Sequence, residues 1–292
     1  PVRMVVPFTP GSATDVIARM IAPQLAERFG QQVVVDNRPS AGGTVAGGIV
    51  AGAPPDGHTL LLASSVFAGS AALYPKLPYD TLRDFTGVTQ IGSTPMVIGT
   101  APASGIKSVR ELIALAQQKP GQVNFGSSGI GSGTHVGGEL FKMTAGIDVI
   151  HVPYKGTAPS VIAVLSGEAH LTYSSIPTAL PYIRAGRLRA LGVTTAKRWP
   201  SLPNLPAIAE SLPGYDSGTY YGMFFPKGTP QAIITRLNSE VNRILQDGSI
   251  KNTLEAQGMA PSSGPPAKFA ERVKKEYDDW ARVVKAAGLK VE

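Results

Sequence analysis

The chain has 292 residues, of which 43% are hydrophobic and 16% charged, so it can bury a sizeable core, and its length favours two domains. No run of about eighteen apolar residues occurs, which excludes a membrane-spanning helix, and the absence of cysteine excludes thiolate nucleophiles, disulfides and sulfur-ligated metals. The net charge of +7 comes from scattered Lys and Arg, which argues against nucleic-acid binding and suits either small anionic ligands or a solvated surface without meaning for partners.

Short β-branched runs alternate with helical patterns along the chain, which predicts an α/β fold with a largely parallel sheet. The chain begins within the first strand, so we expect a mature form whose leader was removed or is absent from this sequence. The first long helix is expected at Ala13–Phe29, with Gly30 as its stop and a kink about one turn before Pro23. The predicted strands are Arg3–Val6, Gln32–Asp36, Thr59–Ala63, Gln122–Phe125, Val149–Val152, Ala169–Tyr173 and Leu188–Thr194.

Further helices follow from small residues, caps and apolar periodicity. Thr44–Ala53 is expected to form a small-residue helix that ends at a Pro-Pro-Asp-Gly turn. Ser108 and Glu111 match a capping box for a helix that ends near Gln118. The C-terminal tail is predicted to form the helices Pro230–Gln246, Ser249–Gln257 and Pro266–Ala287.

Two longer strand-like runs, Pro95–Thr100 and Thr219–Phe225, are predicted to cross between two domains as paired hinge strands. The aromatic pairs within the second run are expected to lie mainly in the core. The expected boundaries are 1–100 plus 226–292 for domain 1, 101–222 for domain 2, and about 95–102 and 219–226 for the hinge strands.

A glycine- and hydroxyl-rich segment, Gly126–His135, follows a predicted strand and opens a helix. Backbone N–H groups at such a helix start lack intrahelical partners, and the helix dipole adds a positive field, so the position suits an anion. Glycines let a ligand approach the backbone closely. A structural glycine turn without a ligand is the alternative.

Sequence motifs for chemistry on this segment are incomplete. Val136 stands where a dinucleotide fingerprint needs its third glycine, and the segment lacks the Gly-Lys-Ser/Thr of a phosphate loop. Ile130 stands where a hydrolase elbow, Gly-x-Ser-x-Gly, needs glycine. We therefore expect neither nucleotide binding nor acyl transfer, no catalytic residue and no cofactor.

The same design recurs at other strand ends. VPFTPGSATD follows the first strand, and its Asp15 is expected either to cap its own helix or to contact a cationic group of a ligand. Three further strand ends carry the segments LLLASSVFAGS, HVPYKGTAPS and LTYSSIPTALP. Because ligands of open α/β sheets bind beyond the carboxyl ends of the strands, we expect a cleft lined by neutral donors that suits carboxylates.

The four histidines show no metal-ligand spacing, and no metal site is expected. His135 in the glycine segment is expected either to donate to a ligand carboxylate or to cap its own helix.

Several segments resemble the Bug family, the extracytoplasmic solute receptors of tripartite tricarboxylate transporters. They keep the family's order, cover nearly the whole chain and form a highly specific set. The segments are VVPFTPGSATDVIAR, VVVDNRPSAGGTVAGG, LPYDTLRDF, GSGTHVGGELFKMTAGIDVIHVPYKGTAP, AGRLRALGVTTAKR and GTPQAIITRLN. Ser12 and Ser40 replace glycines that are common in the family, and Ser12 puts the identity of the ligand in doubt.

The resemblance implies a two-domain periplasmic binding protein, a Venus flytrap that closes on a carboxylate held chiefly by backbone amides and ordered waters. In the first domain, it implies binding through Phe8, Thr9, Gly11, Ser12, Ala13, Thr14, Asp15, Ser64, Ser65, Val66 and Phe67. In the second domain, it implies binding through Ser127, Ser128, Gly131, Gly133, Thr134, His135, Tyr154, Lys155, Gly156, Ser174 and Ser175.

The functional hypothesis is therefore a monomeric periplasmic receptor that delivers a small carboxylate to the membrane permease subunits of a tripartite tricarboxylate transporter. An acidic amino acid would use Asp15 for its ammonium group, whereas an aromatic acid would need a flat apolar slot formed by Phe8, Phe67 and Tyr154. A ligand-sensing partner of a membrane sensor kinase is the alternative, and an esterase or dehydrogenase is disfavoured by the failed motifs.

Overall fold

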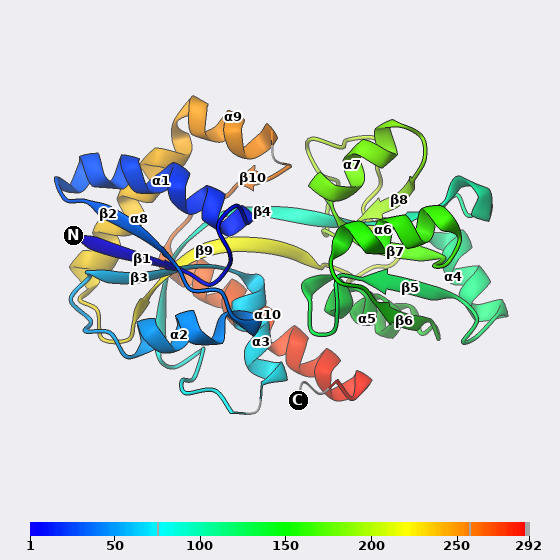
Figure 1. Ribbon diagram of the computed structural model, residues 1–292, viewed down its shortest axis with the longest axis horizontal. Helices are drawn as coiled ribbons and strands as arrows, with labels where there is room; N and C mark the ends of the chain where they lie inside the picture. Colours follow the sequence, from blue (N-terminus) through cyan, green and yellow to red (C-terminus); the bar gives the residue numbers. More distant parts are fainter. Residues whose placement is uncertain (75, 257, 290–292) are drawn as a thin grey trace. The chain divides into compact units, whose positions relative to one another are not determined.

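The computed structural model describes residues 1–74, 76–256 and 258–289, and its elements are labelled in Figure 1. The strands are β1 Val2–Val6, β2 Val33–Asn37, β3 Thr59–Ser64, β4 Phe85–Thr100, β5 Asn124–Ser127, β6 Ile150–Pro153, β7 Leu171–Ser175, β8 Arg189–Val193, β9 Gly218–Pro226 and β10 Ala260–Pro261. The α-helices are α1 Ala13–Phe29, α2 Thr44–Ala51, α3 Ser65–Leu73, α4 Val109–Gln118, α5 Gly133–Ala145, α6 Thr157–Ser166, α7 Ile176–Arg184, α8 Gln231–Gln246, α9 Gly248–Ala256 and α10 Pro266–Ala287. Three short 3-10 helices are η1 Ala41–Gly43, η2 Pro102–Ser104 and η3 Ile208–Glu210.

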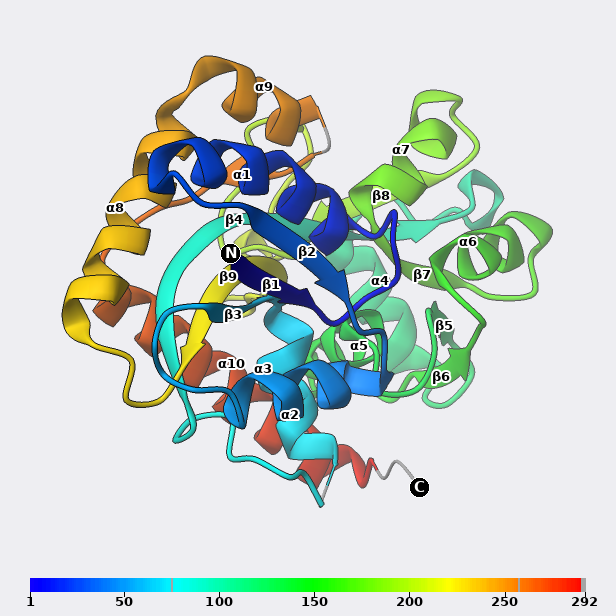
Figure 2. The same cartoon turned by 60° about the vertical axis from the view of Figure 1, so that its left-hand side comes forward.

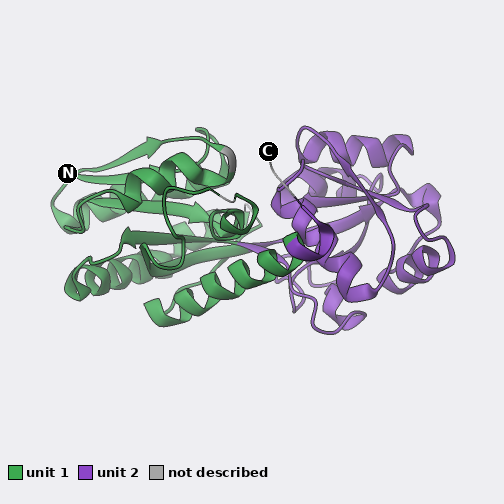
Figure 3. Cartoon of the chain, turned by 90° about the horizontal axis from the view of Figure 1, so that it is seen from below, with its two compact units in different colours: residues 1–93, 220–284, 292 green, residues 94–219, 285–291 purple. Residues whose placement is uncertain are grey.

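The chain forms two compact units, coloured separately in Figure 3. Unit 1 comprises Pro1–Ser93 and Tyr220–Val284, and unit 2 comprises Thr94–Thr219 with residues 285–289. The divisions fall inside β4 and β9, the two strands that the sequence predicts as crossings. The assignment of these strands as hinges between moving domains stays a prediction.

In unit 1, β1 lies between β2 and β3 and pairs with both in parallel, whereas β9 pairs with β3 antiparallel. Successive residues of β1 face opposite sides: Met4 and Val6 pack with α1 and α8, and Val5 packs with α2, α3 and α10. Figure 2 shows these two sets of helices on opposite sides of the strands. Both faces of the sheet are therefore buried, as expected for parallel strands between helix layers.

In unit 2, β5 lies between β6 and β7 and pairs with both in parallel, whereas β4 pairs antiparallel with β7 and β8. A Cβ atom on Gly138 of α5 would meet the Phe125 ring, and one on Gly126 would meet Ser160 of α6. Adjacent residues of β5 thus face different helices. The sheet is mixed rather than largely parallel, because β4 and β9 run against their neighbours.

Most predicted elements are present, with shifted ends. Helix α1 has the predicted bounds and ends at Gly30, which adopts φ 63°. β4 begins at Phe85 rather than at Pro95. The predicted capping box is half formed: Ser108 Oγ accepts the Glu111 N–H, but the Glu111 carboxylate accepts from Lys107.

Some tail predictions extend beyond the described residues. α9 ends at Ala256, and Gln257, which the sequence assigned to that helix, lies outside the described residues. Residues 290–292, predicted as the end of domain 1, also lie outside them. The aromatic residues of β9 are buried, as predicted: Tyr220, Tyr221, Phe224 and Phe225.

Candidate functional site

Two loops, one in each unit, share the same hydrogen-bond pattern. Loop A, Gly11–Asp15, comprises the end of the β1–α1 connection and the first residues of α1, and loop B, Gly131–His135, is the corresponding segment between β5 and α5. Ser12 caps α1 by accepting the Asp15 N–H over 3.3 Å, and Ser132 caps α5 by accepting the His135 N–H over 3.2 Å. Both caps satisfy one of the amides that every helix start leaves without a partner.

A second contact in each loop runs backwards from the helix. The Gly11 N–H donates to Asp15 Oδ2 over 2.9 Å, and the Gly131 N–H donates to His135 Nδ1 over 3.1 Å. The two glycines adopt φ 82° and 73°, a conformation that favours glycine. The sequences GSATD and GSGTH are therefore two copies of one helix-opening turn.

The turns leave donors free at the helix starts. In the described part of the chain, no hydrogen bond takes up the amides of Ala13, Thr14, Gly133 and Thr134. The starts of α3, α6 and α7, at Ser64, Gly156 and Ser175, also have no side-chain cap. Unpaired amides and the positive helix ends make these positions receptive to carboxylates.

The Asp15 carboxylate accepts several hydrogen bonds from its own unit, of which the sequence predicted only those of a local cap. Its carboxylate accepts from Gly11, from Arg19 Nε over 3.0 Å and from Asn37 Nδ2 over 2.9 Å. Burial raises its pKa, but the hydrogen bonds from Arg19, Gly11 and Asn37 outweigh burial and hold the pKa below its usual value. The carboxylate is thus ionised and serves the local role, and its contact with a ligand ammonium group stays a prediction.

His135 is buried with 2% of its surface exposed and stacks on His151 of β6, with ring centroids 3.7 Å apart. His151 Nε2 lies 2.6 Å from Ser127 Oγ. Burial lowers the pKa of His135 to about 4 and that of His151 to about 3, with the Lys142 charge adding to the effect. Both rings are neutral at pH 7.

The hydrogen bond with Gly131 fixes the role of the His135 ring. Because Nδ1 accepts from Gly131, the ring proton lies on Nε2, which faces Glu139 Oε1 at 4.0 Å. The role supported by these contacts is that of a local acceptor, and the predicted donation to a ligand carboxylate finds no free ring nitrogen on the loop side.

The Thr134 hydroxyl is also occupied by its own loop. It accepts from the Ser128 N–H over 2.9 Å and lies 2.8 Å from Ser128 Oγ and 2.9 Å from Ser132 Oγ. Ser132 Oγ donates to Gly129 O, so Thr134 is the donor in its contact with Ser132. By contrast, the Thr14 hydroxyl makes no hydrogen bond with any described residue.

The three residues predicted for an aromatic slot have different surroundings. Phe67 is 1% exposed and packs against Phe85 and Phe224 in the core, so its ring cannot form a slot for an aromatic acid. Tyr154 Oη donates to Glu168 over 2.8 Å. Phe8 is half-buried, and its carbonyl accepts from Asn37. The predicted aromatic slot is therefore wrong in its Phe67 part.

The remaining predicted residues lie at the expected strand ends. Lys155 is exposed, and Gly156 adopts φ 118° at the start of α6. Ser174 is buried and donates to the Ser175 carbonyl, and Ser175 Oγ lies 3.0 Å from the Thr178 hydroxyl. Thr9 lies in the loop before α1, and Ser65 and Val66 are the first two residues of α3.

Sequence reasoning missed three residues that support these loops: Arg19, Asn37 and His151. The repeated Gly-Ser-x-Thr pattern was a usable signal, since it marks the next residue, Asp15 or His135, as the acceptor in each copy. Asn37 becomes visible only when β2 is placed beside β1, where it pairs with Val6.

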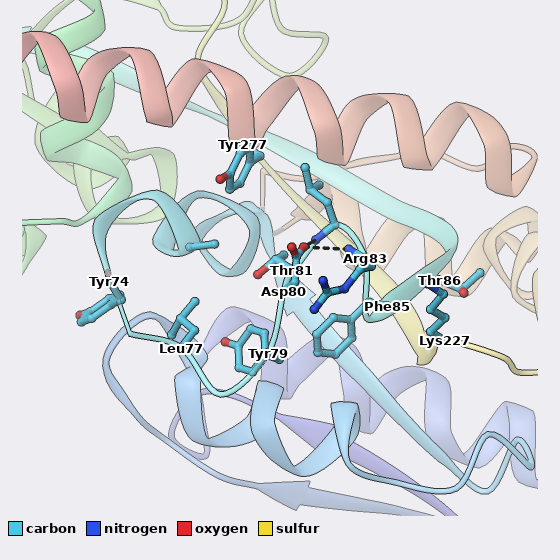
Figure 4. Close-up of a pocket in the computed structure, with 12 residues that line it drawn as sticks. Tyr74, Leu77, Tyr79, Asp80, Thr81, Arg83, Phe85, Thr86, Lys227 and Tyr277 are labelled. Atoms are coloured by element: carbon cyan, nitrogen blue, oxygen red, sulfur yellow. Dashed lines mark hydrogen bonds between the residues drawn. The ribbon is translucent and has the colours of Figure 1, made fainter.

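A separate cavity of about 790 Å³ in unit 1 lies at the C-terminal end of α3 (Figure 4). Its wall includes the LPYDTLRDF segment, where Asp80 accepts the Leu82 and Arg83 amides and Arg83 pairs with Asp84. This segment is a turn that satisfies its own charges. The cavity lies at the opposite end of α3 from its uncapped start at Ser64.

Within the described residues, no group of three or more His, Asp or Glu is placed to hold a metal ion. No helix among them combines the length and apolar character needed to cross a membrane.

Comparison with known proteins identifies a family and several similar structures. The family described as the tripartite tricarboxylate transporter family receptor matches residues 17–289. Protein BugT of Bordetella pertussis is 36% identical, with 100% of this chain and 90% of the relative covered. The structure of an R. palustris protein with adipate is 39% identical, with a TM-score of 0.81 and 99% and 97% of the two chains covered. MatC from Rhodopseudomonas palustris with bound malate is 32% identical, with a TM-score of 0.78 and coverage of 97% and 98%.

The α/β fold is that of a two-domain periplasmic binding protein, since the structure of the periplasmic binding protein BugD also matches over 100% of this chain with a TM-score of 0.78. The chain belongs to the family of tripartite tricarboxylate transporter receptors, which includes the Bug proteins.

Proposed function

We propose that this protein is a periplasmic receptor that binds a small carboxylate and delivers it, chemically unchanged, to the membrane permease of a tripartite tricarboxylate transporter. The ligand class includes mono-, di- and tricarboxylates, acidic amino acids and aromatic acids. In this proposal the two units act as the two domains of the receptor, β4 and β9 act as hinges, and donors of both units bind the same ligand.

The observation that carries the proposal is the set of unpaired amides at the starts of α1 and α5. A carboxylate satisfies several such donors at once, and hydrogen bonds to a charged acceptor are stronger than those between neutral groups. The site residues offer no nucleophile with a base beside it: Ser127 meets His151, but a ring with a pKa of about 3 is a weak base. Related structures with adipate and malate support the carboxylate class.

Isothermal titration calorimetry against a panel of acids tests the proposal. The panel comprises adipate, malate, citrate, aspartate, glutamate and benzoate, and adipamide serves as the control because it has the length of adipate without its charge. We expect at least one acid to bind and adipamide to give no heat. Binding of no acid in the panel, or equal affinity for adipate and adipamide, would contradict the proposed function.

A further inference from the structure

The two helix-opening turns differ at the residue that holds the glycine. Loop A uses the carboxylate of Asp15, whereas loop B uses the imidazole of His135 in the same position. Loop A offsets its negative charge with Arg19, which donates to both Asp15 oxygens over 3.0 Å. Loop B needs no such partner, because its acceptor is uncharged.

The groups that face His135 come from two elements. On β6, His151 stacks on the ring, and on α5, Glu139 lies 4.0 Å from Nε2. Lys142 pairs with Glu139 over 3.0 Å, which leaves that carboxylate largely compensated. Burial, with a smaller effect of the Glu139 charge, raises the pKa of Tyr173 on β7 well above its ordinary value. The imidazole is thus enclosed in a packed polar cluster at the N-terminal end of α5.

We propose that His135 is a positioning residue, whose neutral ring holds Gly131 so that the amides of Gly133 and Thr134 stay open for a carboxylate. The inference deepens the proposed function and rests on it. A carboxylate at position 135 would hold Gly131 equally well, but it would place a negative charge under the start of α5 and oppose an anionic ligand.

Acid changes the ring from acceptor to donor. A proton on Nδ1 faces the Gly131 N–H, so the two donors repel and the turn loses its second contact. Burial holds the His135 pKa at about 4, so the turn stays intact at neutral pH and is lost in acid. Glu139 attracts that proton and Lys142 opposes it.

Three substitutions separate these effects. His135→Leu keeps the bulk and removes the acceptor. His135→Asn restores an uncharged acceptor at the site of Nδ1, and loop A shows that a side-chain oxygen at this position receives the glycine N–H. His135→Asp keeps the acceptor and adds a charge.

The measurement is calorimetric affinity for adipate, and for malate in parallel, at pH 7.5. We expect His135→Leu to bind about tenfold more weakly than wild type, the size of one ordering hydrogen bond. His135→Asn should bind about tenfold more tightly than His135→Leu. His135→Asp should bind more weakly than His135→Asn, with a difference that shrinks in high salt.

A pH series, restricted to pH values at which circular dichroism shows every variant still folded, provides a readout that loss of folding would not move. Between pH 6 and pH 4 wild type should lose more affinity than His135→Asn, and protonation of the acid itself cancels in this comparison. His58→Asn, at an exposed histidine of unit 1, is the matched control and should follow wild type.

The outcomes distinguish the inference from the function beneath it. If wild type binds neither adipate nor malate, nor any other acid of the panel, the proposed function fails. If wild type binds and His135→Leu binds equally well, or His135→Asn restores nothing, the positioning role is wrong and the receptor function stands. Hydrogen exchange of the Gly131 amide gives a check without ligand: it should be faster in His135→Leu than in wild type.

Discussion

Removal of single amide donors from α1 and α5 tests the binding chemistry directly. Proline at the first helical position lacks the N–H but fits the helix start, so Ala13→Pro and Gly133→Pro delete one donor each. A proline at these positions is compatible with the residue before it, because Ser12 and Ser132 are extended, with ψ of 158° and 159°. Ala13 is exposed, which leaves room for the ring.

The magnitude follows from the charge of the acceptor. A hydrogen bond to a charged group contributes about 1.5 to 3 kcal/mol, so each variant should bind its carboxylate about ten- to hundredfold more weakly. The free energy of unfolding should change little, since neither amide has a partner in the described part of the free protein.

Calorimetry with the tightest-binding acid of the panel measures the effect, and two controls isolate the donor. Ala13→Val adds bulk and keeps the N–H, and Gln231→Pro places proline at the exposed start of α8, outside the site. Both controls should bind close to wild type. Proline variants that bind as tightly as wild type, or an Ala13→Val variant that binds as weakly as Ala13→Pro, would show that these amides do not bind the ligand.

Three further changes test the hydrogen bonds of the site and the packing of the fold. Thr134→Val leaves the Ser128 N–H without its acceptor and should lower the free energy of unfolding by about 1 to 3 kcal/mol. Thr14→Val should instead lower the affinity for the carboxylate with little effect on the free energy of unfolding. Equal effects of the two substitutions in a denaturant titration would contradict this. Because the folded-state pKa of His135 is about 4 against an ordinary 6.5, its contribution to the free energy of unfolding is fully present above pH 6.5 and is lost as the pH falls towards 4. At pH 5 wild type should have lost about 2 kcal/mol more of this free energy, relative to pH 7.5, than His135→Asn. Equal losses in the two proteins between pH 7.5 and pH 5 would contradict this. Gly69→Ala places a methyl 2.1 Å from a Trp280 ring atom, so the free energy of unfolding should fall by about 1 to 3 kcal/mol and the thermal midpoint by several degrees. An unchanged midpoint would show that α10 moves to make room for the methyl group.

Local signals in the sequence predicted most helices and strands well. The bounds of α1 and α10 match their predictions, because each combines an apolar periodicity with a clear end signal. The first half of β4 was missed, since residues 85–94 carry few cues of their own and are held by non-local pairing with neighbours such as β10. The antiparallel direction of β4 and β9 depends likewise on contacts distant in sequence.

The loops that open α1 and α5 were predictable as anion-receptive turns, because unpaired amides are a property of any helix start. The side-chain contacts within these loops were not predictable from the sequence. Asn37 reaches Asp15 through the β1–β2 register, and His151 reaches His135 through the β5–β6 register. The Phe67 ring was wrongly offered for an aromatic slot, because the direction of a side chain at a helix start depends on packing against distant residues such as Phe85, and the ring lies in the core.

Amide NMR during a titration detects whether the unpaired amides bind the carboxylate. The perturbation is the addition of the tightest-binding acid of the panel to saturation, and the observable is the chemical shift of the amides of Ala13, Thr14, Gly133 and Thr134. We expect downfield shifts of these amide protons in both units, since each gains a charged acceptor. Saturated binding that leaves all four resonances in place would contradict it.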